Sequence, residues 1–134
     1  MIRGGDERAG FEADAQPARR LLRLRAWGFW DLDLTRAACA GFLLAYQEMQ
    51  AAGSPWDVLI DHTRYPPQKP EVNDDIARSV ALAMTMGLRR IASILDSTVA
   101  QIQLRKVSKS SGLPVDVYSF FTSEDEAMAW LLKT

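Results

Sequence analysis

The stretch WDVLIDHTRY, residues 56–65, decides the fold of this 134-residue chain. Its apolar run at residues 58–60 ends abruptly in the polar sequence DHTR. This pattern is typical of a buried strand whose carboxyl end emerges into a polar crevice. We therefore predict a strand over residues 57–61. We also expect a binding site where it ends, since open α/β sheets bind ligands at the carboxyl ends of their strands.

The segments before this strand predict a β-hairpin and a long helix. Residues 11–15 alternate weakly and suit a short edge strand, while the alternation RLLRLRAW of residues 20–27 predicts a stronger one. Apolar residues then recur every three or four positions over residues 34–49, and Gly53 and Pro55 end that helical pattern. A strand, a helix and a strand in this order imply a right-handed crossover and parallel pairing.

The segments after the strand continue the alternation of helices and strands. The predicted elements are a stiff proline-rich loop at 66–70, a helix over 71–86, a strand over 88–95, a helix over 98–111, a strand over 115–121 and a last helix capped by Ser123. In the helix over 98–111, we expect Val99, Ile102 and Val107 to face inward.

These elements predict one α/β domain over residues 11–134, preceded by a flexible, polar and glycine-rich segment at residues 1–10. The expected architecture is a single, mostly parallel mixed sheet with an antiparallel edge strand, in the order ββαβαβαβα, with helices covering the sheet.

Composition and motifs exclude several classes of function. Sixteen basic and seventeen acidic residues give a net charge of −1, so nucleic acid is not an expected partner. No apolar run is long enough to span a membrane, and no secretory signal precedes the domain, so we expect a cytoplasmic protein. One cysteine, Cys39, and one histidine, His62, predict neither a disulfide nor a metal site. The phosphate-binding glycine motifs and the G-x-S-x-G motif are absent, and no cofactor is expected.

Three stretches in order, at residues 22–30, 58–61 and 120–131, resemble the STAS / SpoIIAA-like family, small bacterial proteins that also show a likeness to Sec14-like domains. The resemblance covers residues 11–132 and implies the SpoIIAA-like fold. The family's antagonists carry a phosphorylated serine at the start of the helix after the organising strand. Here residues 69–75 contain no serine or threonine, so that phosphorylation site does not carry over.

The predicted topology gathers polar and aromatic side chains at the carboxyl edge of the sheet. These candidate ligand- or partner-binding residues are Trp30, Asp31, Asp61, His62, Thr63, Arg64, Tyr65, Asp74, Asp96 and Ser97. An enzyme would use Asp61 or Asp96 to orient His62 as a general base. However, Asp61 and His62 are adjacent, so on a strand they point to opposite faces. We therefore expect no catalytic residues.

The main functional hypothesis is a non-enzymatic regulatory or protein-interaction module that works through residues 61–65 and 71–75. The alternative is a protein that binds a small ligand or lipid in a pocket lined by Trp30, Trp56 and Tyr65 at the same edge. The expected partner is thus an unknown protein or a small apolar ligand, and the aromatic content is also compatible with a homodimer.

Overall fold

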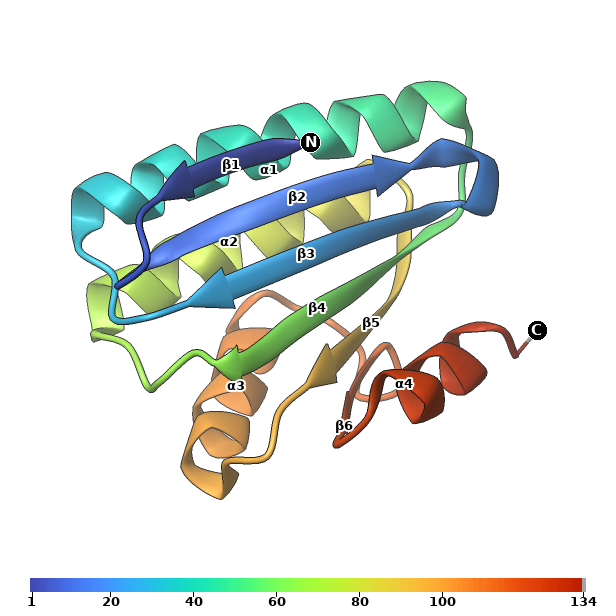
Figure 1. The fold of residues 1–134 in the computed structure, drawn as a ribbon. Helices are drawn as coiled ribbons and strands as arrows, with labels where there is room; N and C mark the ends of the chain where they lie inside the picture. Colours follow the sequence, from blue (N-terminus) through green and yellow to red (C-terminus); the bar gives the residue numbers. More distant parts are fainter. Residues whose placement is uncertain (134) are drawn as a thin grey trace.

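The computed structural model describes residues 1–133, within which the chain forms a six-stranded sheet and four α-helices (Figure 1). The strands are β1 (Ile2–Gly5), β2 (Gly10–Gln16), β3 (Leu21–Trp27), β4 (Trp56–Arg64), β5 (Leu88–Ile94) and β6 (Tyr118–Phe121). The helices are α1 (Leu32–Ala52), α2 (Pro70–Thr85), α3 (Thr98–Ser110) and α4 (Glu124–Leu131), and a 3₁₀ turn (Pro17–Arg19) joins β2 to β3. No helix among these residues is long and apolar enough to cross a membrane.

The strands lie in the sheet in the order of the chain, from β1 to β6. The first three pair antiparallel, whereas β3, β4, β5 and β6 pair parallel. Right-handed crossovers that all step in one direction place their helices on one face. Accordingly, α1, α2 and α3 pack on one face of the sheet and α4 packs on the other (Figure 1). The predicted α/β fold with a mostly parallel mixed sheet is confirmed.

This strand order changes where a ligand site is expected. Ligand crevices of open α/β sheets form where the strand order reverses. Within residues 1–133 the order never reverses. The physical reason for expecting a crevice at the carboxyl end of β4 therefore does not hold.

Strand alternation sorts the core side chains between the two faces. Leu22, Leu24 and Ala26 pack in the core under α1, α2 and α3, whereas Leu21 and Leu59 pack against α4. This is the period of two expected for a pleated strand. The helix-covered face holds the larger core, so any interior cavity is to be sought there.

The prediction that residues 1–10 are flexible is wrong for residues 2–5, which form β1 and pair with β2. The segment 11–15 is consequently the second strand and not the edge. Gly4 lies against the Phe11 ring, where an added Cβ would approach a ring carbon to 2.5 Å. This close approach requires glycine, but glycine is depleted in most strands, so the sequence of residues 2–5 does not indicate a strand.

Two further expectations need correction. The helices cover the second face only in part, because α4 packs over β4, β5 and β6. In α3 the inward residues are Ala100, Leu104 and Val107, while Val99 and Ile102 are 62% and 53% exposed. Both stripes have helical spacing, so the sequence alone did not distinguish them.

Candidate functional site

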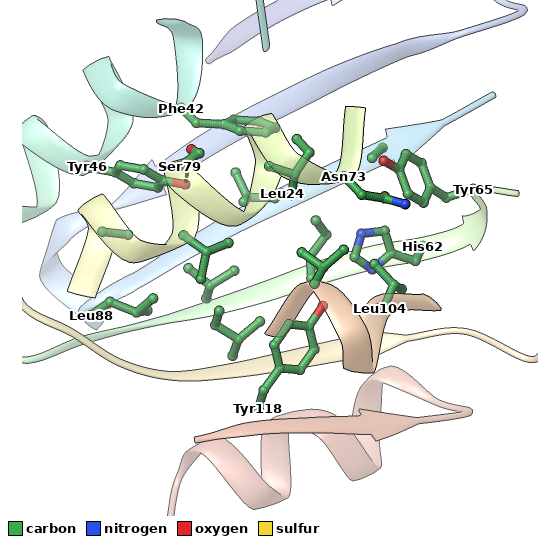
Figure 2. A pocket seen from close by; sticks show the side chains of 18 of the residues that line it. Leu24, Phe42, Tyr46, His62, Tyr65, Asn73, Ser79, Leu88, Leu104 and Tyr118 are labelled. Atoms are coloured by element: carbon green, nitrogen blue, oxygen red, sulfur yellow. Dashed lines mark hydrogen bonds between the residues drawn. The ribbon is translucent and has the colours of Figure 1, made fainter. Parts of the chain in front are cut away.

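A cavity of about 50 Å³ lies in the core between the sheet and the helices α1, α2 and α3 (Figure 2). Its walls are mainly apolar. The sheet contributes Leu24, Val58 and Ile60, and α2 contributes Ile76, Val80 and Ala83. Protein interiors are close-packed and contain few voids larger than a water molecule, so a cavity with this lining is the candidate ligand site.

His62 is placed in the cavity by the alternation of β4. It follows Val58 and Ile60 at intervals of two residues, so all three side chains point to the helix-covered face. Its ring nitrogen Nδ1 lies 2.6 Å from Oγ of Ser93 on β5, and both residues are buried. The predicted separation of His62 from Asp61 is therefore confirmed.

Tyr65, Asn73 and Tyr118 surround His62 at the same end of the cavity (Figure 2). The Tyr65 ring centroid is 5.0 Å from that of His62. Figure 2 shows the Tyr65 hydroxyl turned toward Asn73. These groups come from β4, α2, β6 and the β4–α2 loop, and together they form the polar end of the cavity.

A second polar pair lies at the other end of the cavity (Figure 2). The hydroxyl of Tyr46 on α1 lies 3.1 Å from Oγ of Ser79 on α2. Buried hydroxyls are costly unless they are hydrogen-bonded, and each of these satisfies the other. The cavity thus has an apolar middle with a polar group at each end.

Burial keeps the ionisable groups of the cavity uncharged. Desolvation lowers the pKa of His62 to about 3, and the nearby Asp61 carboxylate only partly offsets this effect. Burial raises the pKa of Tyr46 to about 12 and also raises the pKa of Tyr65. Burial raises the pKa of Tyr118 as well, and a hydrogen bond with the Ser93 side chain partly offsets this effect. At neutral pH, His62 is therefore a neutral imidazole and the tyrosines keep their protons.

Gln68, in the β4–α2 loop beside the polar end of the cavity, binds the neighbouring segments through hydrogen bonds. Its side-chain oxygen accepts a hydrogen bond from the Trp30 amide at 2.8 Å, and its side-chain nitrogen donates to the carbonyls of Gly28 and Pro66 at 3.0 and 2.8 Å. The Gln103 side chain on α3 accepts from the Gln68 amide at 2.5 Å and donates to its carbonyl at 2.9 Å. The buried Gln68 therefore joins the β3–α1 loop, the β4–α2 loop and α3.

Of the predicted site residues, Trp30, His62 and Tyr65 line the cavity. The others serve elsewhere. Asp31 and Ser97 cap α1 and α3, and the Asp61 carboxylate accepts two hydrogen bonds from Thr63. The remaining three, Arg64, Asp74 and Asp96, lie exposed.

The proposed lining residue Trp56 is not at the cavity. It stacks on Tyr46 with ring centroids 5.7 Å apart, and its indole nitrogen donates to the Met86 carbonyl. Ser93, Tyr118 and Gln68 were not predicted as site residues, and Asn73 was predicted only as part of the partner surface at residues 71–75. The prolines around Gln68 were a usable signal, because a loop poor in amide donors must obtain its hydrogen bonds from side chains.

Comparison with known proteins identifies the fold. No protein-family model and no curated protein matches the chain. A solved structure does match: the crystal structure of an uncharacterized protein from the DUF3478 family, with a SpoIIAA-like fold, from Shewanella loihica PV-4. The match covers 96% of this chain and 98% of that one, with a TM-score of 0.67 and 16% identity.

The protein is thus an α/β protein with one sheet, in which the strands lie in the order of the chain. Its particular architecture is the SpoIIAA-like fold, as the resemblance of residues 11–132 implied. At 16% identity this likeness concerns the fold alone.

Proposed function

We propose that the protein binds a small, mostly apolar molecule in the core cavity and does not chemically transform it. The observation that carries this proposal is the cavity itself, with its apolar walls and the polar groups of His62, Tyr65 and Asn73 at one end. Small-molecule sites combine these two features, and perturbed pKa values such as that of His62 are found in them.

The small volume of the cavity determines how a ligand could bind in it. A cavity of about 50 Å³ has room for one or two water molecules. A ring-sized ligand must therefore displace part of the wall. We infer that α3 moves, because it buries only Ala100, Leu104 and Val107, whereas α1 buries seven residues.

The contact between Ser93 and His62 does not favour catalysis. A nucleophile needs a base whose pKa lies near the working pH. Burial lowers the pKa of His62 to about 3, which makes the imidazole a weak base. The predicted orienting acids also lie elsewhere, since Asp61 is bonded to Thr63 and Asp96 is exposed. Binding without turnover is therefore the better-supported function.

A protein-interaction module remains the second candidate, favoured by exposed apolar side chains at the carboxyl edge. Phe29 follows β3 and is 54% exposed, and Val99 and Ile102 near the start of α3 are exposed to a similar extent. The Lys69 ammonium lies over the Phe29 ring at 5.6 Å from its centroid. This edge would suit a protein partner with apolar and acidic groups.

Native mass spectrometry of protein purified without denaturation separates the two candidates. We expect a retained small molecule, or complex formation with added phenol, if the cavity is the binding site. If the purified protein carries no ligand and added phenol causes no NMR shifts of cavity residues, the proposal is overturned. The protein-interaction module would then be the better-supported function.

A filled cavity is expected to bind less well. The Val107→Leu variant adds a methylene to a residue that lines the cavity and is 4% exposed. We expect its affinity for phenol to fall about tenfold, the usual effect of one methylene in a close-fitting pocket. The measurement is an NMR titration of cavity residues.

Val99→Leu is the matched control, because it makes the same change on the same helix at a residue that is 62% exposed. Its affinity for phenol should stay unchanged. Equal affinity in Val107→Leu and Val99→Leu would place the phenol site outside the cavity and contradict the assignment.

A further inference from the structure

We propose that the ligand of this cavity is electrically neutral and carries a hydroxyl or carbonyl group, as a phenol or a small alcohol does, and is not a carboxylate or a phosphate. This inference rests on the proposed function and names the chemical class of its ligand. In the part of the chain described, the residues that line the cavity include no aspartate, glutamate, lysine or arginine.

Three cations, Arg25, Lys69 and Arg105, lie over aromatic rings, and none of them lines the cavity. Arg25 lies over Trp27 at 5.0 Å from the ring centroid, and Arg105 lies over Phe120 at 4.8 Å. Lys69 lies over Phe29. An anionic ligand in the cavity would thus be desolvated without a charged partner, which is strongly unfavourable.

A neutral polar group, in contrast, finds partners at the polar end. The imidazole of His62 uses Nδ1 for Ser93, which leaves Nε2 to donate or accept according to the tautomer. Tyr65 and Asn73 add a hydroxyl and an amide to the same end. One hydroxyl or carbonyl of a ligand can therefore pair here, while its ring or chain contacts the apolar walls.

The pocket keeps its charge state over a wide range of pH. The titratable groups that face His62 are Tyr65 from the adjoining loop and Tyr118 from β6, and burial raises the pKa of both. Asp61 is the neighbouring carboxylate, on the opposite face of β4. Desolvation holds the pKa of His62 far below neutral. Any pH dependence of binding between about pH 5 and pH 8 must then come from the ligand.

The test compares phenol, benzoate and toluene, which share a ring and differ in the polar group, by NMR titration of the wild-type protein. At about pH 7.5 we expect phenol to shift cavity residues, toluene to bind several-fold more weakly and benzoate not to bind. Between about pH 7.5 and about pH 5, phenol affinity should stay within twofold. Apparent benzoate affinity should rise about 300-fold, because a carboxyl group regains its proton near pH 4.

Each other outcome has a defined meaning. Benzoate binding as tightly as phenol at about pH 7.5, with shifts at the cavity that Val107→Leu reduces, would overturn the neutral-ligand inference while leaving the proposed function standing. Toluene binding as tightly as phenol would overturn the requirement for a hydroxyl or carbonyl. Absence of cavity shifts with all three probes would overturn the proposed function, and this inference with it.

Discussion

Lowering the pH from about 7.5 to about 5 is expected to reduce the free energy of unfolding by about 2 kcal/mol through one side chain, His62. The chain contains no other histidine. Carboxylates titrate mainly below this range, so the effect of His62 can be observed nearly alone. Urea unfolding at a series of pH values measures it.

The loss of stability in acid follows from the difference between the unfolded-state and folded-state pKa values of His62. In the unfolded chain the imidazole titrates at about 6.5, whereas burial lowers the folded pKa to about 3. Between these values the unfolded state binds a proton that the folded state does not, so acid favours unfolding. Stability is fully present above about pH 6.5 and is lost, by at most about 1.4 kcal/mol per pH unit, as the pH falls toward the folded pKa.

The His62→Gln variant provides the control. Glutamine can still hydrogen-bond to Ser93 but cannot take up a proton, so the stability of this variant should not change between about pH 7.5 and about pH 5. A wild-type protein with equally flat stability would show that the imidazole is hydrated or charged in the folded state. That result would also remove the basis for a neutral cavity.

The features that the sequence predicted correctly are local ones. The run at residues 58–60 and the alternation around it place His62 and Asp61 on opposite faces of β4. The predicted cap at Ser123 accepts a hydrogen bond from the Glu126 amide, three residues further along the chain. Such interactions are specified by spacing alone, so a single sequence suffices to predict them.

The features that the sequence could not predict depend on register between distant segments. Ser93 reaches His62 only because Ile60 pairs with Ser93 across β4 and β5. A shift of one residue would turn Ser93 to the other face. That register depends on packing between distant segments, which spacing along the chain does not reveal. The sequence therefore predicted Trp30, His62 and Tyr65 but not their interior partners Ser93 and Tyr118, and the other predicted polar residues mostly proved to be caps or exposed side chains.

Replacing Gln68 by alanine is expected to lower the free energy of unfolding by about 3 kcal/mol, the largest effect among these predictions. The change deletes the acceptor for the Trp30 amide and the donor to the carbonyls of Gly28 and Pro66. Gln68 is 5% exposed, so water cannot readily replace these bonds. Each buried group left unpaired costs about 1 kcal/mol or more, and chemical denaturation measures the sum.

Two control variants separate the side chain of Gln68 from its backbone. Gln103→Ala removes the bonds to the amide and carbonyl of Gln68 but keeps its side-chain bonds, and should cost about 1–2 kcal/mol. Gln47→Ala makes the same change at an exposed site on α1 and should stay within about 0.5 kcal/mol of wild type. Gln68→Ala no more destabilising than Gln47→Ala would mean that the loop is hydrated and the polar end of the cavity open. A large loss confined to Gln68→Ala and Gln103→Ala would instead mean that the two glutamines hold α3 and Trp30 against the cavity, so that ligand uptake must work against these hydrogen bonds.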